Sequence, residues 1–119
     1  MQDAVSALIA QMRAQRERWV DVGEGRSVCV LALRETEIGM MREKGRMIDI
    51  VVEQAVNWRG FTGATLLGPG VGHSDAVVFD RDLFDEWVRD HADVASSIAA
   101  VLVADAKARV QALEATRKN

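Results

Sequence analysis

Apolar residues recur with a helical period at the start of the chain. Before Arg16, four apolar side chains lie three and four residues apart with polar residues between them, namely Val5, Leu8, Ile9 and Met12. This spacing predicts an amphipathic helix that ends near Arg16. Its apolar stripe is narrow and would lie against another surface. Residues 1–17 are therefore a candidate for packing on a neighbouring subunit.

The helical period then gives way to alternation. The stretch "RWVDV" alternates apolar and polar residues, "GEG" supplies a turn, and "RSVCVLAL" is β-branched and apolar. We predict a β-hairpin from about Arg18 to Leu33. Because an isolated hairpin is marginal in water, this hairpin requires a sheet with one covered face.

A helical period returns from Glu35 onward. Six residues recur as one face: Ile38, Met41, Gly45, Ile48, Val52 and Ala55. We predict one long helix, which breaks or is closely packed at Gly45, since glycine in a helix interior costs about 1 kcal/mol relative to alanine. The stretch "MIDIVVEQAV" also has the content of a strand, and a strand remains the alternative there.

The stretch "VNWRGFTGATLLGPGVGHSDAVVFDRDLF" holds most of the glycines, the only proline and all three phenylalanines. A P-loop would need a lysine followed by Ser or Thr after its last glycine, but Pro69 and Gly70 follow Gly68. A dinucleotide-binding loop would follow a clear strand and open a helix, and "GPGVG" does neither. Glycines also permit tight turns with positive φ. We therefore interpret residues 57–79 as a glycine-rich connection.

Two helices are predicted after this connection. Asp80 can cap the first of them, and its apolar face comprises Leu83, Phe84, Trp87 and Val88. After a break at "RDHAD", a final helix points five residues inward and frays into "EATRKN": Val94, Ile98, Val101, Leu102 and Ala108. The predicted fold is α+β, with an N-terminal helix, a β-hairpin, a long helix, a glycine-rich loop and two C-terminal helices.

Length and composition bound the class of protein. A chain of 119 residues can bury a core without metal or disulfide, and we predict a single domain over residues 1–119. The net charge is -3 with both signs interspersed, so no basic field for nucleic acid is expected. No apolar run approaches membrane-spanning length, and the spaced apolar residues of the first twenty positions do not resemble a signal peptide.

The candidate chemical groups do not converge on a site. The single cysteine, Cys29, lies in an apolar run and is expected to be buried, which suits a reducing cytoplasm. His73, His91 and Cys29 lack the spacing of a zinc site. His73, Ser74 and Asp75 are adjacent in the chain, whereas catalytic triads are assembled from distant positions. We predict no metal, no cofactor and no enzymatic activity.

The aromatic residues divide into two groups. Trp19 and Trp87 have apolar neighbours and are predicted to lie in the core. Trp58 and Phe61 flank "RG" at the start of the glycine-rich connection. They either pin the connection onto the core or form an exposed hot spot for a partner.

Two parts of the chain carry a resemblance to a known family. The first is the hairpin "WVDVGEGRSVCVLAL" leading into "RETEIGMMR". The second is "VVEQAVNWRGFTG" followed by "DAVVFDRDLFDEWVRDHADVASSIAAVLVADAKA" and the ending "ATRKN". In this order, with a tryptophan-glycine corner and two closing helices, the chain after Arg18 resembles the small tail assembly chaperones of long-tailed bacteriophages and prophages. The segment "GPGVGHSD" is longer and richer in glycine than the family pattern.

The resemblance implies a non-enzymatic assembly factor in the cytoplasm of the bacterial host cell. Such chaperones hold the helical tape measure protein in solution and help to recruit tail tube proteins, and they can self-associate as homo-oligomers. No family motif identifies the binding residues. From their apolar character we take Trp58, Phe61, Leu66 and Leu67 as candidate partner-binding residues, with core packing as the alternative for all four.

The resemblance also implies a test in the gene. Related genes commonly make a longer product by ribosomal frameshifting near the end of the short one. Lys118 and Asn119 are compatible with slippery codons.

Two other functions remain open from the sequence. The chain could be a structural component of the phage particle, such as a connector or tail-end protein. It could also be a phage or host regulatory protein that binds a bacterial partner.

Overall fold

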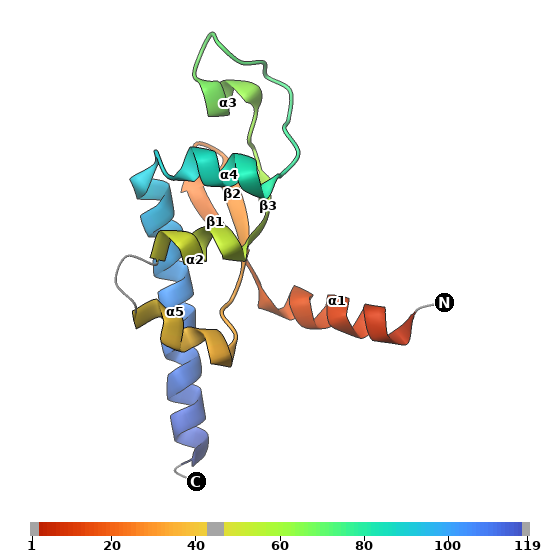
Figure 1. Cartoon of the computed structure of the whole chain (residues 1–119), viewed down its shortest axis with the longest axis vertical. Coiled ribbons are helices and arrows are strands. Elements are labelled where there is room, and N and C mark those ends of the chain that lie inside the picture. Colours follow the sequence, from red (N-terminus) through yellow and green to blue (C-terminus); the bar gives the residue numbers. More distant parts are fainter. Residues whose placement is uncertain (1–2, 43–46, 118–119) are drawn as a thin grey trace.

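A three-stranded antiparallel sheet forms the centre of the molecule. The computed structural model describes residues 3–42 and 47–117. Strands β1 (Glu17–Gly23), β2 (Arg26–Leu31) and β3 (Ala55–Arg59) pair in the order β1-β2-β3. Helices cover one face of this sheet (Figure 1), which confirms the predicted α+β class.

Strands β1 and β2 form the predicted hairpin. Trp19 pairs with Cys29 and Val20 with Val28 in the register. The turn carries a positive φ at three successive residues, 23 to 25, and glycine occupies two of these positions because it lacks the Cβ that disfavours this conformation. The first half of the fold therefore follows directly from the alternating pattern.

The single long helix predicted from Glu35 was wrong. The chain instead forms a 3-10 helix, η1 (Glu35–Arg42), a short α-helix, α2 (Met47–Gln54), and strand β3. Gly45, where a break was expected, lies outside the described residues. Ala55 to Arg59 pair with the open edge of β2, with Trp58 opposite Val28. A β-branched and aromatic segment next to an unpaired strand edge gains a full ladder of backbone hydrogen bonds there.

Three helices pack on the sheet and close the core. They are α2, α4 (Arg81–Val88) and α5 (Ala92–Arg117). The core includes Val20 and Val28 from the sheet, Val51 from α2, Phe84 from α4 and Ile98 from α5, all buried. The covered face that the hairpin requires is supplied by these helices.

The two C-terminal helices form as predicted, with one difference in the buried face of α5. The Asp80 carboxylate accepts a hydrogen bond from the Leu83 backbone nitrogen at 3.0 Å and caps α4. The buried positions of α5 follow a four-residue spacing, with Val94, Ile98, Leu102 and Ala106. Ala106 therefore takes the inward position assigned to Ala108, which is exposed.

The far end of α5 and the side chain of Val101 also differ from the prediction. Val101 is half-buried rather than buried. The helix continues to Arg117 instead of fraying at "EATRKN", and the Arg109 guanidinium donates to the Leu33 carbonyl oxygen at 2.6 Å. This hydrogen bond holds the second half of α5 beside the end of the hairpin.

Trp19 lies outside the core, contrary to the prediction. Val20 and Val22 of β1 point into the core, so the period of the strand turns Trp19 to the opposite face of the sheet. The indole is 37% exposed and the Arg59 guanidinium lies over its ring at 3.8 Å. Trp87 and Cys29 are buried, as predicted.

Helix α1 (Ala4–Arg16) forms as predicted and runs away from the rest of the molecule (Figure 1). None of its residues is buried. It passes into β1 without a loop, because Arg16 already pairs with Ala32: the Ala32 nitrogen donates to the Arg16 carbonyl oxygen at 2.7 Å, and the Arg16 guanidinium donates back to the Ala32 carbonyl oxygen at 3.2 Å. These two hydrogen bonds tie the last residue of α1 to the residue that follows β2.

Candidate partner-binding surfaces

Residues 60–79, here called the arm, extend from the end of β3 beyond the helical layer (Figure 1). Two aromatic side chains anchor its base. The rings of Trp58 and Phe61 are stacked with centroids 4.2 Å apart, and both residues are buried. The Trp58 indole nitrogen donates to the Val77 carbonyl oxygen at 2.7 Å. The first and last parts of the arm are therefore tied together at the core.

Backbone contacts close the arm above this base. The Val77 nitrogen donates to the Phe61 carbonyl oxygen at 2.9 Å, and the Ala64 nitrogen donates to the His73 carbonyl oxygen at 2.8 Å. A Cβ atom on Gly72 would overlap the carbonyl group of Gly63 and lie 2.6 Å from the Ala64 nitrogen. The glycine-rich stretch is thus a structured connection, and glycine at position 72 permits its two sides to touch.

A short helix, α3 (Gly63–Leu67), presents the leucines of the arm. The Thr62 hydroxyl accepts a hydrogen bond from the Thr65 nitrogen at 3.1 Å and caps its start. Gly68 ends the helix with φ 106°, and its nitrogen donates to the Ala64 carbonyl oxygen. These two residues set the length of α3 and hence the direction of the two leucines.

The four candidate partner-binding residues differ in how far they are buried. Trp58 and Phe61 are buried, so they anchor the arm and do not line an exposed surface. Leu66 is half-buried and packs against the core. Leu67 is 66% exposed. Only the leucine pair therefore remains available to a partner, with Leu67 as its outermost side chain.

Two exposed residues of the arm, Val71 and Val78, were missed from the sequence. Val78 stands between Val77 and Phe79, which both pack against the core. In an extended segment, neighbours of inward side chains point outward. The alternation in "VVF" was the signal that could have identified Val78.

A groove lies between the leucines of α3 and the outer side of α4. It has a volume of about 230 Å³ and is lined by Leu66, Leu67, Leu83, Glu86, Trp87, Asp90 and His91. The His91 ring stacks on Trp87 with centroids 4.1 Å apart, and its Nδ1 lies 2.8 Å from the Trp87 carbonyl oxygen. We call this the arm groove; its floor is apolar and aromatic, and its rim on α4 is acidic.

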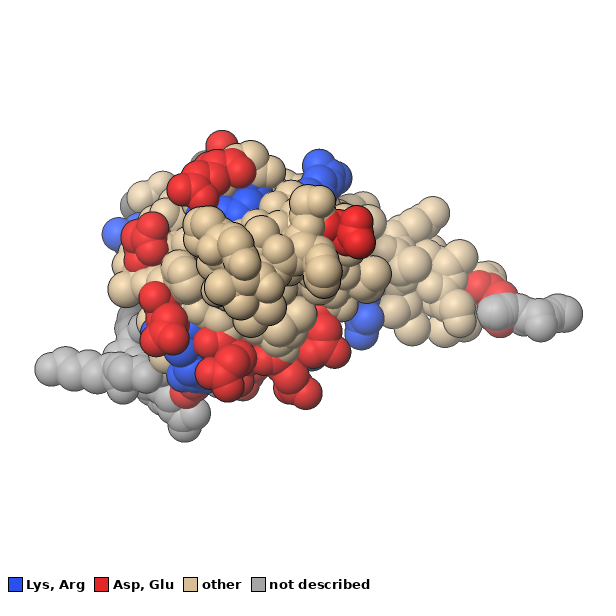
Figure 2. Space-filling view, turned by 90° about the horizontal axis from the view of Figure 1, so that it is seen from above, with Lys and Arg blue, Asp and Glu red and all other residues tan. Residues whose placement is uncertain are grey.

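The arm carries no charged side chain before Asp75. The sequence has no Lys, Arg, Asp or Glu from Gly60 to Ser74. Seen from above, a largely uncharged area is surrounded by charged side chains of both signs, with the acidic ones more extensive (Figure 2). An apolar centre inside a polar rim is the usual anatomy of a protein-protein interface.

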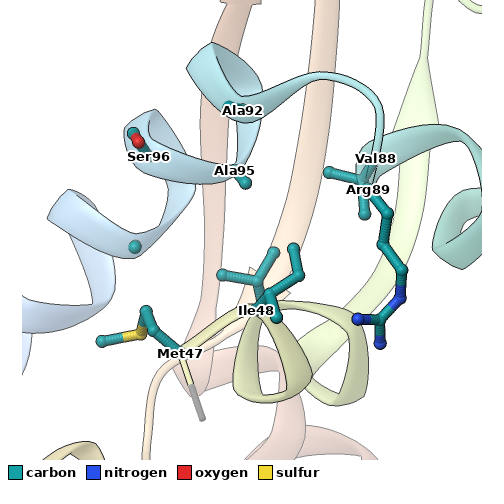
Figure 3. Close-up of a pocket in the computed structure, with 9 residues that line it drawn as sticks. Met47, Ile48, Val88, Arg89, Ala92, Ala95 and Ser96 are labelled. Atoms are coloured by element: carbon teal, nitrogen blue, oxygen red, sulfur yellow. The ribbon is translucent and has the colours of Figure 1, made fainter. Parts of the chain in front are cut away.

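A second groove, here called the helical groove, lies between α2 and the α4–α5 corner (Figure 3). Its volume is about 430 Å³. Met47, Ile48 and Val51 line it from α2, and Val88 and Arg89 from the end of α4; α5 contributes only small side chains, namely Ala92, Ala95, Ser96 and Ala99. A layer of small residues opposite larger ones leaves room for side chains from another helix.

Arg89 closes one end of the helical groove. Its guanidinium forms ion pairs with Asp85 and, at 3.0 Å, with Asp49. The hydrogen bonds that the Arg89 guanidinium donates, first to Asp85 and second to Asp49, raise the pKa of Arg89. Arg89 therefore holds α4 and α2 together at the groove edge and remains charged.

The described residues do not form a metal site or a catalytic site from the candidate groups considered above. In residues 3–42 and 47–117, no three His, Cys, Asp or Glu side chains are grouped so that they could hold a metal ion. Burial, with the charge of Glu17 adding to it, raises the pKa of the Cys29 thiol, so this thiol stays protonated and is a poor nucleophile. His73, Ser74 and Asp75 are all exposed on the arm.

Among the helices in the described part of the chain, none has the length and apolar character to cross a membrane. Comparison of the sequence with protein-family models and curated proteins, and of the fold with solved structures, finds no match.

Proposed function

We propose that this protein is a non-enzymatic assembly factor that binds a helical segment of another protein along its arm. The observation that supports the proposal is the arm itself, a rigidly anchored segment that exposes Leu67, Val71 and Val78 to solvent. Exposed apolar side chains on a structured segment lower solubility unless a partner covers them. Such an arrangement is typical of a surface kept for binding.

The shape of the arm groove favours a helix as the partner. The groove has room for one or two large apolar side chains between Leu67 and Trp87, and helices present such side chains three and four residues apart. Glu86 and Asp90 on its rim favour a helix whose flanks carry Lys or Arg. The partner is therefore an amphipathic helix with basic flanks.

The family resemblance supplies a specific client. A tail assembly chaperone binds the tape measure protein, a long rod with extended apolar faces that would otherwise aggregate, and helps to recruit tail tube proteins around it. Many weak arm contacts along one rod would act together through avidity. On this proposal the protein acts in the cytoplasm of the bacterial host cell and carries out no catalysis.

Coexpression with the tape measure protein from the same gene cluster tests the proposal. Wild-type protein should raise the soluble fraction of the tape measure protein and copurify with it. Leu67→Asp places a charge on the α3 side of the arm groove and should weaken this association by about tenfold or more, the effect of losing one important contact. Val110→Asp, on the far half of α5, is the matched control and should retain wild-type activity.

Three results would contradict the proposal. Wild-type protein could fail to retain any tape measure protein, Leu67→Asp could bind as well as wild type, or the gene cluster could lack a long helical client. Mass spectrometry of purified particles separates the remaining functions. A chaperone is absent from particles, whereas a connector or tail-end protein is present.

A further inference from the structure

The structure leaves two apolar surfaces uncovered that have complementary shapes. One is the stripe of α1, where Val5, Leu8, Ile9 and Met12 are 70%, 58%, 49% and 64% exposed. The other is the helical groove, whose α5 wall is built from small side chains (Figure 3). Large side chains on one helix and small ones on the other can interdigitate when their spacing agrees.

The spacing of the two surfaces is the same. The α1 stripe occupies positions 5, 8, 9 and 12, and the small residues of the groove occupy positions 92, 95, 96 and 99. Both sets are separated by three, four and seven residues, so each spans about 10 Å of helix. One α1 helix therefore matches the groove along its whole length.

Helix α1 does not reach the groove of its own molecule. The Ala32 nitrogen donates to the Arg16 carbonyl oxygen where α1 meets β1, and α1 then runs away from α2 and α5, which bound the groove (Figure 1). To fold back, α1 would have to break this pairing at the end of the sheet. A second copy can present its α1 without any such change.

Charge favours one orientation of the contact. Helix α1 contains Arg13 and Arg16 near its C-terminal end and no acidic residue. At the Arg89 end of the groove, two carboxylates, Asp49 and Asp85, pair with this single arginine and leave a net negative charge. Opposite charges attract across such a contact, and antiparallel helix dipoles add to the attraction. An antiparallel arrangement would place Met12 next to Ala92, and Val5 next to Ala99.

We infer that α1 of one copy binds antiparallel to α5 in the helical groove of a second copy, so that the protein self-associates through this contact. The contact uses neither Leu67 nor the arm groove. The test of this contact is therefore independent of the test of client binding.

Disulfide trapping between two variants tests both the contact and its orientation. Met12→Cys and Ala92→Cys proteins, purified separately and mixed under mild oxidation, should give a linked dimer, as should Val5→Cys with Ala99→Cys. The pair Met12→Cys and Ala99→Cys should link much more slowly and serves as the matched control. The native Cys29 is buried and does not interfere.

The mass of the full-length protein in solution provides the second measurement. Leu8→Asp and Ser96→Trp, one on each side of the contact, should each weaken self-association at least about tenfold by light scattering, whereas Val78→Asp on the arm should not. Circular dichroism establishes that each variant is folded. Monomeric wild-type protein, unchanged mass in Ser96→Trp, or linkage of Met12→Cys only to itself would overturn the inference.

Discussion

The indole nitrogen of Trp58 donates to the carbonyl oxygen of Val77, nineteen residues later in the chain, at 2.7 Å. This single hydrogen bond joins the last part of β3 to the returning end of the arm. Since Trp58 is also stacked on Phe61, one side chain fixes where the arm leaves the core and where it comes back.

Trp58→Phe keeps an aromatic ring but removes the donor. The Val77 carbonyl oxygen then loses its partner, and we expect the free energy of unfolding to fall by about 1 to 2 kcal/mol. Limited proteolysis should cut first between residues 68 and 76. Unchanged stability in urea, together with unchanged cleavage, would show that the bond does not hold the arm.

Gly72→Ala introduces a Cβ atom where the two sides of the arm touch. We expect the arm to separate, at a cost of about 1 to 3 kcal/mol for forced overpacking, with amide exchange accelerating at Ala64. Gly39→Ala is the matched control, because a Cβ atom there meets nothing within 4 Å. Equal stability of the two variants would contradict the close approach of Gly63 and Gly72.

Asp80→Ala removes the cap of α4. We expect a loss of about 1 kcal/mol in the free energy of unfolding, measured by urea denaturation. Asp80→Asn should restore most of this loss, since an asparagine side chain can also accept from the Leu83 nitrogen. If Asn is as destabilising as Ala, the carboxylate acts through its charge and not through the cap.

Cys29 makes stability depend on alkaline pH. Its pKa is raised in the folded protein by burial, so the unfolded chain loses the thiol proton first. The contribution of the Cys29 thiol to the free energy of unfolding is fully present below pH 9.0, the ordinary pKa of the thiol. This contribution is lost as the pH rises through the raised pKa of the folded protein. Cys29→Ala should show a shallower decline in unfolding free energy above pH 9.0. Identical slopes would contradict the assignment.

The sequence predicted elements whose pattern is local. The hairpin, α1 and the two C-terminal helices are each specified by a period and a turn or cap within their own residues. Strand β3 was missed because its formation depends on the free edge of β2, more than twenty residues away. A helical period that continues through Ala55 carries no information about that edge.

The candidate site was predicted only in outline. The aromatic pair Trp58 and Phe61 could be placed at the start of the glycine-rich connection, but whether it was buried depended on α4 covering it. The helical groove could not be foreseen, because its walls come from three elements. The small residues of α5 do not by themselves indicate a groove, because the groove exists only when α2 lies opposite them.

The arm, which is uncharged from Gly60 to Ser74 and surrounded by charged side chains, affects how the protein behaves in concentrated solution. Near neutral pH, carboxylates around the arm repel those of other molecules and keep the exposed leucine and valines of two arms apart. As the pH approaches the sequence isoelectric point of 5.3, the net repulsion disappears while the apolar centre is unchanged. Reversible clouding or crystal growth should then begin with arm-to-arm contacts, and buffers well above this pH should preserve a clear solution.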